Sequence, residues 1–535
     1  MGVSTDVHKR RNDGSLMTAQ PASGDGTAQS EPQGTGMAWL DARAGTANVA
    51  TAGETSARPL LLLTAGRAVA FVATFATPLV LTRVLNQSAF GTYKQLFLVY
   101  STLAGIAQFG MAESLLYFLP FAPRRGGRYV LNALVILASA GLACLGGLAL
   151  AGPRVGRWLG NGALPGLLGL LGVYLFLMLP SLVLEIVTTA RKRYLGAAVA
   201  YGLSDLLRAV ALVVPILVSR RLEWLLMGVV AFAVVRLSAT LVYLLKEFGA
   251  ELRPDRGALR EQLAYALPFQ LGVVLAILVG NLHLYVVAAS VDAATFAIYT
   301  IGCLQIPLVD LLFTPAGNVM MVRMREAISA HRPQVVLTTW HDTTRKLALV
   351  FLPLVGLLLV TGRELILSLF TARYAASVPI FMVWSAHIVF AVLQTDGVLR
   401  VYAKTRAIAL LYAVHLLLLA ALIRLLMSAF GLIGAVLATV LAAGLGKSLA
   451  LLYARRLMGV PLAQMLPWRN LKEVLGIVAV SALVALVVKT HLTVPPLPLL
   501  VMTSGAYAAT YLGIMVARRA QSVRVFGARE REPST

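Results

Sequence analysis

Apolar segments of about 20 residues follow one another along almost the whole chain after residue 58. Because a helix rises about 1.5 Å per residue, each segment is long enough to cross the hydrocarbon core of a bilayer, which is about 30 Å thick. The segments are apolar on all sides, whereas the strands of a membrane β-barrel alternate. The pattern therefore predicts an all-α integral membrane protein with about 14 transmembrane helices. We place these spans at residues 59–82, 93–119, 129–151, 164–189, 197–218, 223–246, 264–288, 297–322, 345–368, 378–402, 407–429, 431–453, 472–489 and 496–517.

The composition agrees with a membrane location. Of the 535 residues, 59% are hydrophobic and 13% are charged, whereas a soluble domain is about a quarter charged. The formal net charge is +23. The basic residues lie between apolar segments and form no stripe interleaved with aromatic residues, so we expect no nucleic-acid partner. Cys144 and Cys303 lie far apart inside apolar segments, which excludes a disulfide framework and a cysteine metal site.

The spans predict five parts of the chain. Residues 1–58 are polar and rich in Gly, Ser, Thr and Ala, so we expect a disordered cytoplasmic leader. The other expected parts are an N-terminal six-helix lobe, a C-terminal six-helix lobe, two extra transmembrane helices and a basic cytoplasmic tail. Their predicted boundaries are 59–246, 247–453, 454–517 and 518–535.

The loops predict the orientation of the chain. With the N-terminus inside, the inside loops hold about 22 Lys and Arg residues and the outside loops about 9. A miscounted helix would invert this bias in the segment that follows it, and no inversion occurs. We therefore expect both termini in the cytoplasm.

A short repeat relates the two predicted lobes. Phe90-Gly91-Thr92-Tyr93 begins the second span, and Phe296-Ala297-Ile298-Tyr299 begins the eighth, 206 residues later (296 minus 90). This offset covers six helices, an even number, so the two lobes have the same orientation. They would be related by a pseudo-two-fold axis along the membrane normal and would enclose a cavity between them.

Several short motifs resemble one transporter family. They are Leu81-Thr82-Arg83-Val84-Leu85, Ala89-Phe90-Gly91-Thr92-Tyr93, Gln108-Phe109-Gly110 and Leu263-Ala264-Tyr265-Ala266-Leu267-Pro268. Together with the topology, they resemble the oligosaccharide-lipid flippases of the Wzx type, in the multidrug/oligosaccharidyl-lipid/polysaccharide exporter superfamily. This chain lacks the acid that the family has before Gly110. Glu113, one helical turn beyond Gln108, is the candidate replacement.

The resemblance implies a MATE-like exporter with two lobes in a bacterial cytoplasmic (inner) membrane. It would move undecaprenyl-diphosphate-linked oligosaccharide units outward by alternating access, for exopolysaccharide, capsule or O-antigen synthesis. The expected partners are this polyprenyl-diphosphate-linked oligosaccharide, membrane lipid and the polysaccharide polymerase or assembly proteins. The alternatives are a lipid II flippase and a MATE-type drug or cation antiporter. We expect no enzymatic activity, because every outside loop is short, and no cofactor beyond H⁺ or Na⁺ as the coupling ion.

Ionisable residues deep in the spans are the best candidates for function, because each is costly in lipid. We predict that Arg67 and Arg236 contact substrate phosphate, with Gln270 and Asn281 as weaker candidates for lining the cavity. The candidates for ion coupling are acidic or titratable side chains inside the spans, namely Glu113, Asp310, Asp205 and His283. The alternative for the charged residues is that they pair with one another to hold helices together. Two acids have simpler interpretations: Asp205 with Arg208 as a local pair, and Glu185 reaching toward the interface.

Overall fold

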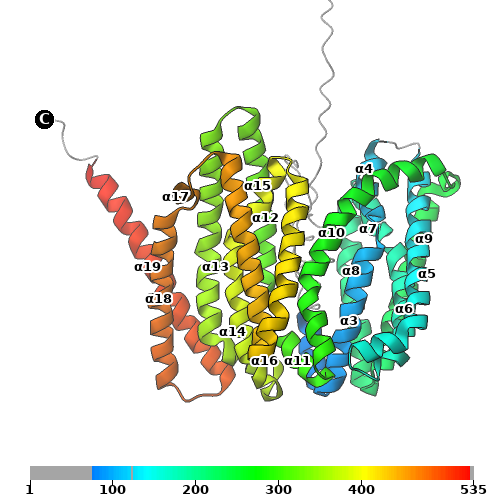
Figure 1. Cartoon of the computed structure of the whole chain (residues 1–535), viewed down its shortest axis with the longest axis horizontal. Coiled ribbons are helices and arrows are strands. Elements are labelled where there is room, and N and C mark those ends of the chain that lie inside the picture. Colours follow the sequence, from blue (N-terminus) through cyan, green and yellow to red (C-terminus); the bar gives the residue numbers. More distant parts are fainter. Residues whose placement is uncertain (1–74, 122–124, 530–535) are drawn as a thin grey trace, which may run out of the picture. The chain divides into compact units, whose positions relative to one another are not determined.

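A computed structural model of the chain describes residues 75–121 and 125–529. In this part every regular element is a helix (Figure 1), which confirms the predicted all-α class. The first half of the described chain holds α3 (Gln87–Ala107), α4 (Met111–Phe121), α5 (Gly126–Trp158), α6 (Leu164–Ser181), α7 (Val183–Ala190), α8 (Tyr194–Ser219) and α9 (Leu222–Phe248). The second half holds α10 (Arg256–Ser290), α11 (Ala293–Gly302), α12 (Pro307–Ser329), α13 (Pro333–Phe370), α14 (Val378–Ala386), α15 (Thr395–Val401) and α16 (Thr405–Met458). The remaining helices are α17 (Leu462–Met465), α18 (Trp468–His491) and α19 (Pro496–Arg529), with short 3₁₀ turns at Gly249–Glu251, Ala372–Ser377 and His387–Val392.

Eleven helical segments of the described chain are long and apolar enough to cross a membrane, or twelve if the bent pair α11 and α12 is one span. That pair bends by 50° where the chain passes from Gly302 to Pro307. Each of the 13 predicted spans from 93–119 onward overlaps a helix, and two of these spans fall within α16. The first predicted span, 59–82, lies mostly outside the described residues.

The longest helical segment, α16, accounts for two predicted spans. Its 54 residues would extend about 80 Å as one helix, far beyond the thickness of a bilayer. The backbone breaks at Gly431, where φ is 59° and ψ is −138°. A side chain at Gly434 would lie 1.8 Å from the Leu426 carbonyl oxygen, and one at Gly446 would lie 3.5 Å from the His415 ring. These contacts require the chain to fold back on itself, so α16 is a helical hairpin with its turn at Gly431.

The second predicted span, 93–119, is interrupted rather than continuous. Helix α3 ends at Ala107, and α4 begins at Met111. Between them Phe109 and Gly110 both have positive φ values, 50° and 67°. Gln108 and Glu113 therefore do not share one continuous helical turn, contrary to the sequence prediction.

The two copies of the sequence repeat occupy equivalent helix starts. Asn86 caps α3 by accepting a hydrogen bond from the Ala89 amide at 2.8 Å, and Asp292 caps α11 by accepting one from the Thr295 amide at 3.2 Å. Asn86 and Asp292 are themselves 206 residues apart, so the equivalence includes the capping residues. The two helix starts also touch: a methyl group at Gly91 would lie 1.7 Å from the carbonyl oxygen of Ala293.

This contact predicts that Gly91→Ala destabilises the protein. The backbone of α11 must move to admit the methyl group, at a cost of about 1–3 kcal/mol. We expect a lower midpoint of thermal unfolding in detergent and a lower yield of folded protein. Gly169→Ala in α6 is the matched control, because nothing lies within 4 Å of its added methyl group. An unchanged midpoint in Gly91→Ala would show that the two helix starts are not in contact.

Large apolar side chains lie on the outside of the helical array. Leu150, Val218 and Leu417 have exposed fractions of 84%, 83% and 69%. Such surfaces would aggregate in water but suit lipid chains, so they form the expected membrane-facing surface. The interior contains large fully buried aromatic residues, including Phe90, Phe296 and Tyr299 of the repeat.

Asp255 ties together the loops at one end of the first half. Its Oδ1 accepts hydrogen bonds from the Gly257 and Ala258 amides at the start of α10, and its Oδ2 accepts one from Arg128 Nη1 at 3.0 Å. The Ala258 amide and the Arg128 guanidinium hold the pKa of Asp255 below its ordinary value. The charged carboxylate is therefore the form that stabilises the fold.

The depressed pKa predicts a pH-dependent effect of Asp255→Asn. A carboxylate with a lowered pKa stabilises the protein above its ordinary pKa, about 4, and that contribution is lost as the pH falls. The Asn variant keeps a capping oxygen but not the charge facing Arg128. We expect its unfolding midpoint to lie below that of the unchanged protein at pH 7, and the two midpoints to converge only below pH 4, as the pH falls through the lowered pKa of Asp255. A difference that is constant over this pH range would exclude the charge as its cause.

Two contacts fasten the last helices to α13. Lys489 of α18 pairs with Glu364 of α13 at 2.8 Å, and Glu364 is only 4% exposed. In α17, just before α18 begins, the Met465 carbonyl accepts a hydrogen bond from the Trp340 indole at 2.7 Å. Helices α18 and α19 therefore pack on the second half beside α13 (Figure 1).

Candidate functional site

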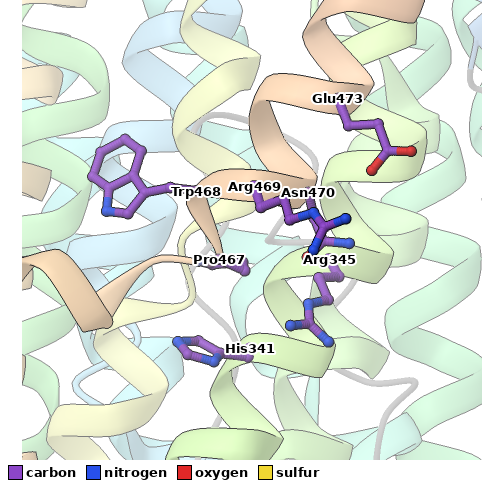
Figure 2. A pocket seen from close by; sticks show the side chains of 7 residues that line it. All are labelled: His341, Arg345, Pro467, Trp468, Arg469, Asn470 and Glu473. Atoms are coloured by element: carbon purple, nitrogen blue, oxygen red, sulfur yellow. The ribbon is translucent and has the colours of Figure 1, made fainter.

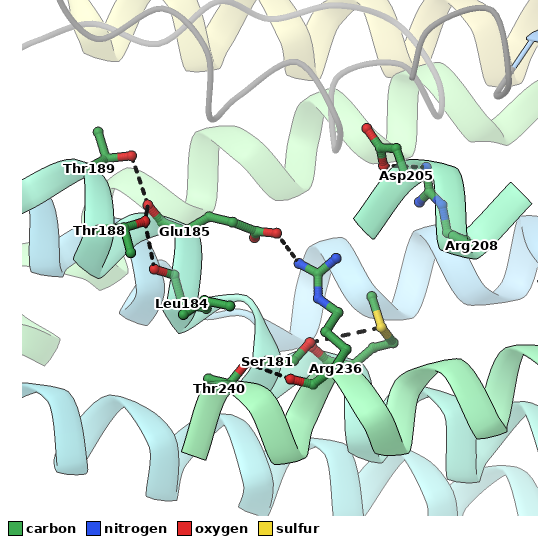
Figure 3. A network of polar contacts seen from close by, with 10 residues as sticks. Ser181, Leu184, Glu185, Thr188, Thr189, Asp205, Arg208, Arg236 and Thr240 are labelled. Atoms are coloured by element: carbon green, nitrogen blue, oxygen red, sulfur yellow. Dashed lines mark hydrogen bonds and ion pairs between the residues drawn. The ribbon is translucent and has the colours of Figure 1, made fainter. Parts of the chain in front are cut away.

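A buried ion pair lies in the interior of the first half. Arg236 of α9 pairs with Glu185 of α7 at 2.5 Å, and their side chains are 10% and 4% exposed. Figure 3 shows the guanidinium of Arg236 pointing at the Glu185 carboxylate. Glu185 therefore lies inside the protein and does not reach the membrane interface, contrary to the sequence interpretation. In this state Arg236 forms an ion pair that joins two helices, which is the alternative to phosphate binding that the sequence left open.

A second ion pair lies on α8, a helix that contacts both α7 and α9. Arg208 and Asp205 of α8 are 3.1 Å apart (Figure 3), as their spacing on one helix face predicts. The two pairs contribute two acids and two arginines from three helices that contact one another. We call these four residues the arginine–acid cluster: Glu185, Asp205, Arg208 and Arg236. Arg67, the other predicted phosphate contact, lies outside the described residues.

Four polar side chains on one face of α10 form a stripe that contacts α3 and the segments around it. Gln270 donates to the Gly105 carbonyl at 2.7 Å, and Asn281 donates to the Thr102 hydroxyl at 2.8 Å. At its two ends, Gln262 bonds Ser114 and Tyr129, and Tyr285 donates to the Leu98 carbonyl at 3.4 Å. Gln270 and Asn281, predicted to line the cavity, thus bridge the first half to the second in this state.

His283 packs in an aromatic group. Its Nδ1 is 2.8 Å from the Tyr299 hydroxyl, and its ring lies 5.4 Å from that of Trp384. The side chain is 3% exposed. Tyr299 belongs to the second copy of the repeat, so His283 connects α10 to the repeated helix start. Its role in ion coupling stays a prediction.

The two predicted acids Glu113 and Asp310 occupy similar local positions. Glu113 lies in the first turn of α4, just after the break at Gly110, and Asp310 lies in the first turn of α12, just after the break that ends at Pro307. Each acid therefore sits at the positive end of a helix dipole, which favours a carboxylate. Breaks of this kind inside spans are where transporters expose backbone groups to ions.

Sequence reasoning missed a polar cluster in the second half. Asp396 pairs with Lys447 of α16 at 3.2 Å and accepts a hydrogen bond from Tyr412 at 2.8 Å. Asp396 and Arg400 are spaced as a local pair, so nothing in the sequence pointed to a lysine 51 residues away as the partner of Asp396. The only signal was that Lys447 is a charge in an otherwise apolar segment.

The chain is similar to known membrane proteins in sequence and in fold. The model of a family described as polysaccharide biosynthesis protein matches residues 80–379. Among solved structures, the lipid II flippase MurJ in an inward closed conformation is similar with a TM-score of 0.68, at 11% identity, over 86% of this chain and 100% of that one. An inward-facing multidrug resistance transporter of the MATE family has a TM-score of 0.57, at 13% identity, over 72% and 94%. A MOP superfamily transporter from Pyrococcus furiosus has a TM-score of 0.50, at 14% identity, over 75% and 95%. No curated protein matches the sequence. At these identities the structural similarity shows the fold alone.

Proposed function

The chain belongs to the family of polysaccharide biosynthesis proteins, and on that premise we propose that it is a flippase for undecaprenyl-diphosphate-linked oligosaccharide units. It would move these units from the cytoplasmic to the periplasmic face of a bacterial inner membrane, for exopolysaccharide, capsule or O-antigen. The observation that carries the proposal is the coincidence of this family with a fold similar to that of a lipid II flippase over that whole chain. Both termini would be cytoplasmic, and the polymerase would take up the product.

The chemistry of the substrate explains why such a protein needs buried charge. A diphosphate sugar head cannot enter hydrocarbon, because an unpaired charge loses its hydration there. A polar cavity between the two halves can hold the head while the polyprenyl tail stays in lipid. Rocking of the halves would then expose the cavity to each face in turn.

We propose that Arg236 exchanges partners during this cycle. In the described state Glu185 neutralises it at 2.5 Å. A substrate diphosphate would compete with Glu185 for the same guanidinium. Loss of the Arg236 guanidinium from beside the buried Glu185 carboxylate would raise its affinity for a proton, because a nearby positive charge favours the ionised acid. Substrate binding and H⁺ uptake would thus share one ion pair.

The remaining predicted residues take supporting roles in the proposal. Arg67 would provide the second phosphate contact. Gln270 and Asn281 would face the substrate once α10 separates from α3. Glu113, Asp310, Asp205 and His283 stay candidates for a coupling site for H⁺ or Na⁺.

Leaflet location of the lipid-linked units tests the proposal. Depletion of the protein should reduce surface polysaccharide while lipid-linked repeat units accumulate on the cytoplasmic face. Purified protein in proteoliposomes should move a fluorescent undecaprenyl-diphosphate oligosaccharide to the opposite leaflet. Normal polymer and an unchanged distribution of these units after depletion would reject the flippase.

The fold supports lipid II as a second candidate substrate, because the MurJ structure aligns over its full length. Lipid II also carries a diphosphate and a polyprenyl tail. The same proteoliposomes separate the two: movement of lipid II without movement of the oligosaccharide lipid would reassign the substrate. New drug sensitivity after depletion, with normal polymer, would instead support an antiporter.

A further inference from the structure

A basic pocket lies where α13 meets the start of α18 (Figure 2), away from the arginine–acid cluster. Its volume is about 540 Å³. It is lined by His341 and Arg345, which lie one turn apart on α13, and by Trp468, Arg469, Asn470 and Glu473 of α18. The pocket residues of α18 lie beyond the stretch that matches the family, whereas His341 and Arg345 lie within it.

The pocket carries net positive charge. Its one acid, Glu473, forms an ion pair with Arg518 of α19, which neutralises it. Arg345 has only a distant pair with Asp342 at 3.8 Å, and both side chains are about half exposed, so this pair is weak. Among the described residues, Arg469 forms no ion pair. Arg345 and Arg469 both line the pocket (Figure 2), so it contains two positive charges that a bound anion would stabilise.

The start of α18 adds amide donors to the same pocket. Trp468, Arg469 and Asn470 are the first three residues of this helix, and Pro467 before them provides no side-chain cap. The Trp468 amide donates to the Leu466 carbonyl at 2.9 Å, so the donors offered to the pocket are the amides of Arg469 and Asn470. The first amides of a helix have no partner within the helix, and they carry the positive end of its dipole. Two guanidinium groups and a helix start are the donors that proteins use for phosphate.

The walls of the pocket are held firmly in place. Trp340, adjacent to His341, is fully buried and bonds the Met465 carbonyl at 2.7 Å. His341 itself bonds the Gln464 carbonyl at 2.8 Å through Nε2. The segment before α18 is therefore fixed to α13 independently of any ligand, so the pocket is formed in advance.

The surroundings place the pocket at the membrane surface. Arg345 and Arg469 border the predicted spans 345–368 and 472–489, on the side predicted to face the cytoplasm. Trp468 is 46% exposed, and tryptophan at the end of a span is typical of the headgroup layer. Basic pockets between helices on this side of a membrane bind anionic lipid head groups.

We propose that this pocket binds a phosphate group, supplied by the headgroup of an anionic phospholipid in the cytoplasmic leaflet. Bound phosphate would join Arg345 of α13 to Arg469 and the first amides of α18. It would thereby stabilise the packing of the last two helices on the second half. The proposal does not depend on the identity of the transported substrate.

Thermal unfolding of the full chain in detergent tests this site. Added phosphatidylglycerol should raise the unfolding midpoint, whereas zwitterionic phosphatidylcholine should not. In the Arg345→Gln/Arg469→Gln variant we expect phosphatidylglycerol to bind at least about ten-fold more weakly, because two charge-assisted contacts are lost. Native mass spectrometry of bound phosphatidylglycerol gives the same comparison without reliance on stability.

The neighbouring basic residues provide a matched control. Lys346→Gln/Lys472→Gln removes the same charge from adjacent positions that do not line the pocket. Equal loss of lipid binding in both double variants would overturn the proposal, as would equal binding by the unchanged and Arg345→Gln/Arg469→Gln proteins. Inorganic phosphate distinguishes the source. If it protects as well as phosphatidylglycerol at equal concentration, the pocket binds phosphate from soluble compounds, and the assignment to lipid is wrong.

Discussion

A crosslink between positions 102 and 281 is expected to stop translocation. Asn281 of α10 bonds Thr102 of α3 at 2.8 Å, so this contact joins the two halves. By the predicted orientation it lies in the outer part of the membrane, where alternating access requires the halves to separate. With Cys144 and Cys303 replaced, Thr102→Cys/Asn281→Cys treated with a short bifunctional thiol reagent should lose movement of the lipid-linked unit in proteoliposomes. The same variant without reagent should keep it.

A matched pair within the first half controls for the chemistry. Asn161 bonds Thr92 of α3 at 2.8 Å, with the same residue types and the same distance. Both residues belong to the predicted N-terminal lobe, so a crosslink there does not join the two halves. We expect Thr92→Cys/Asn161→Cys to remain active after treatment. Full activity of the crosslinked 102–281 protein would show that the stripe on α10 stays closed throughout transport.

Loss of either member of the buried pair Glu185–Arg236 is expected to have the largest effect on stability. Removal of one partner breaks a buried ion pair, which costs about 3–5 kcal/mol. Arg236→Ala and Glu185→Ala should each lower the unfolding midpoint and the amount of folded protein in the membrane. Export of polysaccharide in cells that carry either variant should fall in parallel.

Replacement of both partners separates structure from function. Glu185→Leu/Arg236→Met removes both charges and keeps apolar volume, so the free energy of unfolding should recover to near its original value. If Arg236 contacts the diphosphate, this stable protein should still fail to translocate substrate. Recovery of translocation together with stability would assign Arg236 to helix packing alone. Glu185→Gln adds a test of coupling: it should keep Arg236 hydrogen-bonded while the dependence of transport on a pH gradient disappears.

The membrane-spanning helices could be predicted from the sequence, because lipid requires each of them to be long and apolar. A span must be apolar on all sides and about 20 residues long, so runs such as 197–218 and 472–489 predicted helices directly. Breaks within spans were not accessible, because they depend on single residues. Nothing in Gln108-Phe109-Gly110 distinguishes a break with two positive φ values from a continuous helix that contains one glycine.

From the sequence, the candidate site could be predicted only as a set of residues that are energetically costly in lipid. The contacts between these residues could not be predicted. Arg236 and Asp205 were predicted because a charge in lipid has a high free-energy cost. That cost does not indicate which residues they contact. Glu185 lies 51 residues before Arg236 and close in sequence to basic residues, so its sequence neighbours suggested the wrong environment. Likewise, the polar residues of α10 share one face, but only the packing of α3 against that face turns them into a bridge.

The pair Glu364–Lys489 has a consequence for synthesis of the chain. Glu364 leaves the ribosome 125 residues before the lysine that neutralises it. Until α18 inserts, this acid has to stay hydrated or protonated, because its place in the finished protein is almost fully buried. A nascent chain that is interrupted before α18 therefore presents the Glu364 carboxyl of α13 without Lys489, the lysine that neutralises it in the finished protein. Completion of the last two helices supplies that lysine, so the pair links maturation of the second half to synthesis of the C-terminal end.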